Sequence, residues 1–159
     1  MRSHIFIALV EHKPGVLQRV ASMFSRRRFN IESITVGPTD NNNIARMTIL
    51  TEGDDKILEQ ITKQMNKLSC VIKVIDVGRE DAICRELCLV KIHAPEEKSK
   101  SQVIQYVNVF RGSVVDVNPK SITVEITGDS EKVDAFIQLV RPLGVKEVSR
   151  TGMTAMQRG

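Results

Sequence analysis

The sequence predicts an α+β protein made of two tandem βαββαβ units, and three observations support this fold class. Two short, strongly apolar segments of strand length occur at residues 5–10 and 87–92. Each is followed by the same order of patterns, which is a helical segment, two alternating segments and a second helical segment. Finally, the repeat spans roughly 75–80 residues, the size of one split βαβ domain, so a chain of 159 residues holds two of them.

In the first unit, the period of the apolar residues switches between that of a strand and that of a helix. The run at 5–10 is apolar at nearly every position, which is typical of a strand buried on both sides. One face of the helix that follows is apolar and contains Val16, Leu17, Val20, Ala21, Met23 and Phe24. The remaining elements are two strands, a helix and a strand, expected at 33–36, 45–49, 57–68 and 71–77.

The second unit repeats this order. After the strand at 87–92, apolar residues line one face of a helix over 103–110. A hairpin follows, which turns at Asn118-Pro119. A second helix over 133–140 and a weaker strand over 144–148 complete the unit.

These patterns indicate two ferredoxin-like domains, at residues 1–78 and 84–159, joined by a polar linker at 79–83. Right-handed crossovers place both helices of a unit on one face of its sheet and leave the other face uncovered. Because the strands at 5–10 and 71–77 are apolar on both faces, we expect another unit or another chain to pack there. The sequence therefore predicts at least a homodimer.

Composition excludes several classes of protein. Hydrophobic residues make up 42% of the chain and charged residues 26%, as in folded globular proteins. The longest apolar run, Ile5 to Val10, is too short for a membrane span or a signal peptide, so we expect a cytoplasmic protein. A net charge of +4 with only 4% aromatic residues is not typical of a nucleic-acid-binding protein. The cysteines at 70, 84 and 88 are interpreted as small core residues rather than disulfide or zinc partners.

No catalytic or metal-binding motif is evident. Nucleophile-elbow, phosphate-loop and dinucleotide-binding glycine patterns are missing from the sequence. Histidines 4, 12 and 93 each lack a metal-ligand partner at helical spacing, which favours structural or exposed roles. The acidic pairs at 54–55 and 96–97 suit helix N-termini. The run Arg26-Arg27-Arg28 suits a helix C-terminus, with contact to nucleic acid or to an acidic partner surface as alternatives.

The loop between the first strand and the first helix carries the strongest indication of a ligand. Pro14 suits a first helical turn, but Gly15 beside it costs roughly 1 kcal/mol of helix stability. We therefore expect another group to approach the backbone closely there, and the free N–H groups of that turn would bind a carboxylate. A tight turn without a ligand explains the residues equally well. The matching loop at 93–97 has two acids and no glycine, so an anion would bind only in the first unit.

Several runs of residues are specific enough to suggest a family. The most specific are Asn30-Ile31-Glu32-Ser33, Phe110-Arg111-Gly112 and Val115-Asp116-Val117, supported by runs at 14–20, 46–49, 85–91 and 150–152. With these, the first unit resembles an ACT domain, a ferredoxin-like module that senses small molecules. Nearly the whole chain is similar to the small regulatory subunit of acetolactate synthase (acetohydroxyacid synthase).

The resemblance implies a non-catalytic regulatory subunit of a transferase. Such subunits bind the catalytic subunit of acetolactate synthase, raise its activity and confer feedback inhibition by valine, in the biosynthesis of valine, isoleucine and leucine. Thiamine diphosphate, magnesium and FAD belong to that catalytic partner, and none is expected in this chain. A homodimer through the ACT domains is implied as well.

The resemblance also implies a place for the effector, between two ACT domains of a dimer. Carried over by position, Gly15, Val16 and Leu17 would offer backbone N–H groups to the valine carboxylate. His12, where the family often has Asn, would lie in the same loop. Asn30 and Ile31 of the facing chain would close the site, with the Asn30 amide serving as both donor and acceptor.

Two other hypotheses remain open. The chain could be a stand-alone amino-acid sensor that acts on another enzyme or regulator, although no helix-turn-helix segment is evident. It could also be a ferredoxin-like nucleic-acid-binding protein, which would need aromatic residues exposed on its sheet. The strands offer mainly Phe6 for that purpose.

Overall fold

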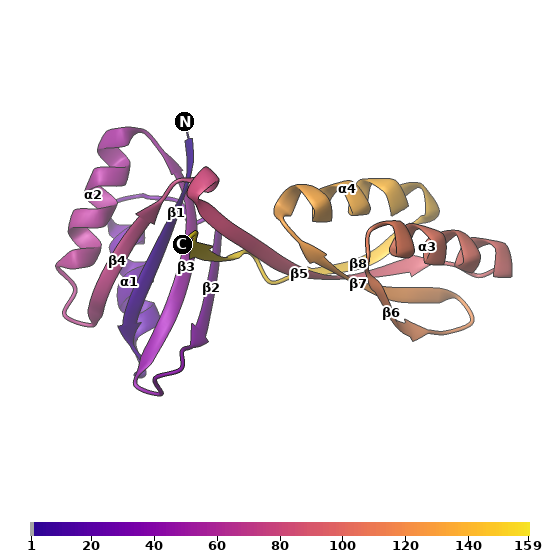
Figure 1. Ribbon diagram of the computed structural model, residues 1–159, viewed down its shortest axis with the longest axis horizontal. Coiled ribbons are helices and arrows are strands. Elements are labelled where there is room, and N and C mark those ends of the chain that lie inside the picture. The colour runs from indigo at the N-terminus through magenta and orange to yellow at the C-terminus, as the bar shows by residue number, and fades with distance from the viewer. Residues whose placement is uncertain (1) are drawn as a thin grey trace. The chain divides into compact units, whose positions relative to one another are not determined.

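The computed structural model describes residues 2–159, which form two compact units (Figure 1). The first unit contains the chain up to Ile83 together with Met153–Gly159, and the second contains Cys84–Gly152. Each unit has two α-helices and four antiparallel strands, so the predicted α+β class with two βαββαβ units is confirmed. A further short strand at Thr154–Gln157 pairs with the strand at Ala82–His93 and is the fifth strand of the second sheet. None of the helices among the described residues has the length and apolar character of a membrane span.

The first unit has the predicted order of elements. Its sheet follows the order β2-β3-β1-β4, so that the first strand lies between the third and the fourth. The predicted strand at 71–77 is found at those residues, whereas the first strand extends beyond 5–10 at both ends. The elements are β1 (Arg2–Glu11), α1 (Val16–Arg26), β2 (Ser33–Pro38), β3 (Ile44–Gly53), α2 (Asp55–Asn66) and β4 (Val71–Val77).

Alternation along β1 divides the first sheet into two faces. Phe6, Ala8 and Val10 belong to the core formed with α1 and α2, both of which lie on one side of the sheet in Figure 1. Ile5 and Ile7 alternate with them in the sequence and point to the opposite face, yet they are as fully buried as Phe6. The opposite face is therefore covered as well.

The cover is a strand that the sequence did not predict. β9 (Thr154–Gln157) lies against β1 and β3 of the first unit, and Ala155 on it is only 3% exposed. Ile5 and Ile7 therefore need no second chain to cover them, and the homodimer stays a prediction. Residues of the same chain bury them.

Hydrogen bonds attach this returning segment to the sheet. The hydroxyl of Thr35 donates to the Met153 carbonyl at 2.9 Å, and the Arg46 guanidinium donates to the Ala155 carbonyl at 2.9 Å. The Ala155 amide donates to the Thr48 hydroxyl at 3.3 Å. Polar groups on the sheet face thus bind the backbone of the segment. Residues 153–159, which we assigned to the second domain, group with the first unit instead.

The second unit repeats the topology, with the strand order β6-β7-β5-β8. The predicted turn at Asn118-Pro119 joins its hairpin, and the Asn118 amide donates to the Ser121 carbonyl at 3.0 Å. The stretch expected as a linker forms a short 3-10 turn (Arg79–Asp81) and the start of β5. The elements are β5 (Ala82–His93), α3 (Glu97–Val109), β6 (Ser113–Val117), β7 (Ser121–Gly128), α4 (Ser130–Val140) and β8 (Val145–Arg150).

The run Arg150-Thr151-Gly152 has a structural role at the end of the second unit. Arg150 forms an ion pair with the buried carboxylate of Glu86, whose other oxygen accepts a hydrogen bond from Ser130 at 3.3 Å. The Thr151 hydroxyl accepts from the Leu87 amide at 3.1 Å. Gly152 follows with a φ of 79°, a left-handed conformation that favours glycine. The run therefore fixes the end of β8 and turns the chain towards β9.

We predict that Ala155→Asp lowers the free energy of unfolding of the first unit by about 3 kcal/mol, because it buries an unpaired carboxylate. Urea unfolding followed by circular dichroism measures the change. Met156→Asp is the matched control, since Met156 is the next residue and is 61% exposed. The only tyrosine, Tyr106, lies in α3 of the second unit, so its fluorescence reports that unit separately. Equal stability of the two variants would contradict the role assigned to β9.

Candidate functional site

The turn between β1 and α1 is built around a glycine in a left-handed conformation. Gly15 has φ 87° and ψ −10° and occupies the N-cap of α1, whose first residue is Val16. A Cβ at Gly15 would meet no heavy atom within 4 Å. Gly15 therefore precedes the first helical turn instead of lying inside it, and the expected close approach of another group stays a prediction. Glycine is favoured here because a positive φ costs other residues roughly 1–2 kcal/mol.

The first turn of α1 differs from the other helix starts in how its amides are satisfied. Among the α-helices described, the other three begin with acidic N-cap residues: Asp54, Glu96 and Asp129. No side chain caps α1, and the Val16 amide makes only a long bond of 3.5 Å to the Lys13 carbonyl. The first amides of α1 therefore keep donor capacity at the positive end of the helix dipole.

The matching helix start in the second unit is occupied by its own side chains. The Glu96 side chain accepts from the backbone of Ser99, and the Ser99 hydroxyl accepts from the Glu96 amide at 3.1 Å. This reciprocal capping box uses the amides that an anionic ligand would need. The acids predicted at this helix start, and those at 54–55, do lie at helix N-termini.

The predicted site residues around the first turn present different groups to solvent. Leu17 is 48% exposed, whereas the Val16 side chain is buried, so Val16 can offer only its backbone to a ligand. His12 is exposed, and its Nδ1 lies 3.2 Å from the Asn42 carbonyl oxygen. The turn therefore combines an exposed imidazole, an exposed apolar side chain and uncapped amides.

The other two predicted site residues lie beyond the far end of α1. Asn30 is exposed, and its backbone carbonyl accepts from the Thr51 hydroxyl at 2.5 Å. Ile31 is half-buried against the core of the first unit. Because α1 has 11 residues, its two ends are about 16 Å apart at 1.5 Å per residue. One chain therefore does not bring Asn30 and Ile31 to the Gly15 turn, and their approach from a facing chain stays a prediction.

The structure assigns other candidate residues to the core or to local contacts. His4 Nδ1 lies 2.5 Å from an Asp76 carboxylate oxygen. Cys70 and Cys88 are buried, and burial raises the pKa of the Cys88 thiol. Over residues 2–159, no group of three or more His, Cys, Asp or Glu side chains is arranged to hold a metal ion. Phe6 is fully buried on the helical side of the sheet, so it cannot stack on a nucleobase.

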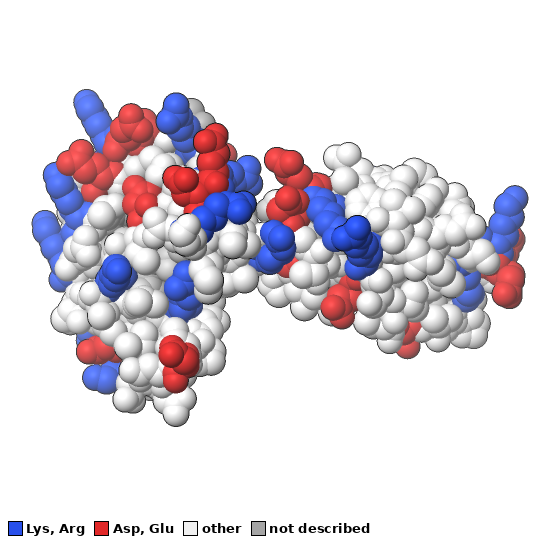
Figure 2. Space-filling model, viewed as in Figure 1, with Lys and Arg blue, Asp and Glu red and all other residues white. Residues whose placement is uncertain are grey.

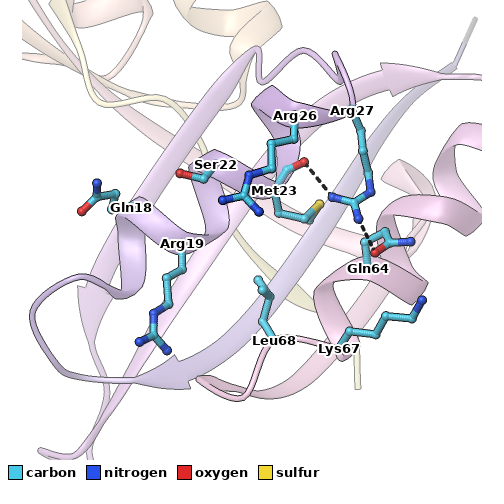
Figure 3. A pocket seen from close by; sticks show the side chains of 9 residues that line it. All are labelled: Gln18, Arg19, Ser22, Met23, Arg26, Arg27, Gln64, Lys67 and Leu68. Carbon is cyan, nitrogen blue, oxygen red and sulfur yellow. Dashed lines mark hydrogen bonds between the residues drawn. The ribbon is translucent and has the colours of Figure 1, made fainter.

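A groove between α1 and α2 was not anticipated from the sequence. It has a volume of about 460 Å³, and Figure 3 shows Arg26 and Arg27 at one end with Arg19 and Lys67 further along. The run 26–28 does end α1, as predicted, but Arg27 also reaches α2, where its guanidinium donates to the Gln64 side chain at 2.7 Å. The seven-residue spacing of Arg19 and Arg26 was the available sequence signal, since it places both near one helix face.

Comparison with known proteins gives a consistent result over the chain. Residues 85–159 match a family model described as the small subunit of acetolactate synthase, and residues 6–73 match an AHAS small subunit-like ACT domain. A probable acetolactate synthase small subunit from Methanothermobacter thermautotrophicus is 62% identical over 99% of this chain and 94% of its own length. An acetolactate synthase small subunit from Mycobacterium bovis is 49% identical over 99% of this chain and 94% of its own length. The crystal structure of the small subunit from Thermotoga maritima is 42% identical and superposes with a TM-score of 0.93, covering 100% of this chain and 99% of that one.

The left-handed conformation of Gly15 generates a stability prediction. Gly15→Ala should lower the free energy of unfolding by about 1 kcal/mol, because alanine resists positive φ. Gly37→Ala is the matched control, since its added Cβ also meets nothing within 4 Å and its φ lies outside the left-handed range. Urea unfolding of both variants measures the difference. If the Gly15→Ala variant is as stable as the Gly37→Ala variant, the turn relaxes to a negative φ that any residue can adopt.

Proposed function

This chain belongs to the family of acetolactate synthase small subunits, ACT-domain regulatory subunits, and from that premise we propose what it regulates and how. It binds the catalytic subunit of acetolactate synthase, raises the activity of that subunit and confers feedback inhibition by valine. It carries out no catalysis itself. Thiamine diphosphate, magnesium and FAD are bound by the catalytic subunit.

The observation that carries the effector proposal is the uncapped start of α1. Valine has a carboxylate, and a carboxylate is the group that free amides at a helix N-terminus bind best. Gly15 lets the chain enter the helix without a capping side chain, so Val16 and Leu17 can donate their amides to the ligand. The exposed Leu17 side chain, 48% accessible, offers an apolar contact for the isopropyl group of valine.

A complete effector site requires two chains in this proposal. The α-amino group of valine needs acceptors, and the Asn30 side chain supplies one together with a donor. Asn30 lies beyond the far end of α1 in the same chain, so the residue that completes a site is the Asn30 of a second copy. The segment Asn30–Ile31 leads into β2, an edge strand whose backbone can pair with another chain. We therefore propose a homodimer through the ACT domains with valine bound where the two copies meet.

The first test measures activation. Adding the purified chain to the acetolactate synthase catalytic subunit should raise kcat several-fold, and valine should then lower the rate. The catalytic subunit alone is the control and should respond weakly to valine. An unchanged rate in the presence of excess chain would refute the proposed function and favour a stand-alone sensor.

A second test measures effector binding without the catalytic subunit. Calorimetric titration with valine, leucine and isoleucine should show saturable binding, with valine bound most tightly. The expected stoichiometry is one valine per Gly15 turn, which is one per chain. Coupling between effector and partner is reciprocal. If valine changes the affinity of this chain for the catalytic subunit by some factor, the catalytic subunit should change the affinity of this chain for valine by the same factor.

A third test locates the effector site. Gly15→Asp places a carboxylate beside the helix start, and Asp tolerates positive φ better than most residues. This variant and Asn30→Ala should abolish inhibition by valine while activation stays largely intact. Asn66→Ala, at an exposed position of α2, is the control and should leave both properties unchanged. Inhibition retained in both Gly15→Asp and Asn30→Ala would place the effector elsewhere.

A further inference from the structure

The groove between α1 and α2 gathers positive charge. Arg19, Arg26, Arg27 and Lys67 line it, and no Asp or Glu is among the described residues that do. Their combined charge equals the formal net charge of the whole chain, +4, so the rest of the protein is balanced overall. On the face shown in Figure 2, acidic and basic side chains are mixed. The groove therefore differs from the general surface in having one sign of charge.

The last turns of the helices differ in charge between the two units. The two units share one topology, and α3 and α4 correspond to α1 and α2. Neither α3 nor α4 has a basic residue in its last turn, whereas α1 has Arg26 and α2 has Lys63 there. The C-cap of α4 is Arg141, as that of α2 is Lys67, so both of these helices end on a cation and the difference between them lies in the last turn.

The groove also has an apolar floor. Figure 3 shows Met23 and Leu68 between the basic side chains, and Met23 is 4% exposed while Leu68 is half-buried. The Arg27 guanidinium is held in place by the Gln64 side chain at 2.7 Å and the Met23 carbonyl at 3.4 Å. A ligand that matches this groove presents acidic groups around an apolar contact.

The spacing of the cations favours an extended ligand over a compact one. Arg19 and Arg26 lie seven residues apart on α1, or about 10 Å along the helix axis. A single phosphate is bound by donors that converge within hydrogen-bond distance of its oxygens. Cations spread over two helices instead suit several carboxylates placed at successive positions of a protein segment. Among the described residues that line the groove, none is aromatic and able to stack on a base, which argues against a nucleic acid.

We propose that this groove is the docking surface for an acidic segment of the catalytic subunit, with an apolar residue of that segment seated on Met23 and Leu68. The inference rests on the proposed function, since it assigns the surface through which the regulatory subunit binds. The residues chosen for the test are not among those of the proposed effector site: Arg26 is in the last turn of α1, and Lys67 is the C-cap of α2.

The test compares three pairs of substitutions by titration against the purified catalytic subunit. Arg26→Glu with Lys67→Glu should weaken binding at least 30-fold, and Arg26→Gln with Lys67→Gln should weaken it about 10-fold, because like charges repel while neutral residues only lose attraction. Lys56→Glu with Lys98→Glu is the matched control at exposed positions outside the groove and should bind within about twofold of the unaltered chain. Raising the salt concentration should weaken the unaltered chain more than the neutral pair.

Two further measurements decide between interpretations. Valine affinity, measured by calorimetry, should be unchanged in the neutral pair, which shows that this variant is folded even if the reversed pair is not. If the unaltered chain binds the catalytic subunit and the neutral and reversed pairs bind as tightly, the groove is not the docking surface. If the unaltered chain does not bind the catalytic subunit at all, the proposed function is wrong, and so is the proposal that a segment of that subunit occupies the groove. Saturable binding of inorganic phosphate or single-stranded RNA that the neutral pair loses would overturn the assignment in favour of that ligand.

Discussion

The handedness of the crossovers in the first unit governs most of what is distinctive about it. Right-handed connections place α1 and α2 on one side of the sheet, and the other side still carries isoleucines that must be buried. In a unit of this size, one uncovered sheet face is a large share of the core. The chain meets this requirement by returning with β9, whose backbone is hydrogen-bonded by Thr35, Thr48 and Arg46. A domain that looks complete after β4 is therefore completed by residues far along the chain.

The contrast between the two repeats separates what the fold needs from what the function uses. Both units have the same strand order, and both bury apolar cores against two helices. Only in the first is the opening helix left without a capping side chain, and four cations line the groove between its two helices. In the second unit, Glu96 and Ser99 satisfy the same helix start. The second unit thus serves as an internal control for the first. It shows the fold alone, whereas the first has the changes that a ligand and a partner would require.

Local periodicity was enough to predict most of the fold, because strand and helix patterns depend on neighbours in the sequence. The alternation at 122–126 and the run at 71–77 placed β7 and β4 correctly. β9 was missed because Ala155 and its neighbours have no alternating apolar pattern, and the strand depends on contacts with distant residues, namely β5, with which it pairs, and Thr48, more than a hundred positions earlier. For Gly15, the sequence pointed to the residue but not to its conformation, since a positive φ at a helix start has no local signature apart from glycine itself. The Asn30 half of the site stays a prediction, because α1 separates it from the Gly15 turn within one chain.

Since the first unit contains residues on both sides of the second, the second unit is an insertion in it. The chain leaves the first unit after Ile83 and re-enters it at Met153. During synthesis, a ribosome makes β1 to β4 early, yet it must translate the entire inserted unit before the strand that covers Ile5 and Ile7 is available. β8 ends at Arg150 and β9 begins at Thr154, so the first unit exposes an apolar sheet face throughout the synthesis of the second. During that interval, the bare face is the part of the nascent chain most open to chaperones and to aggregation.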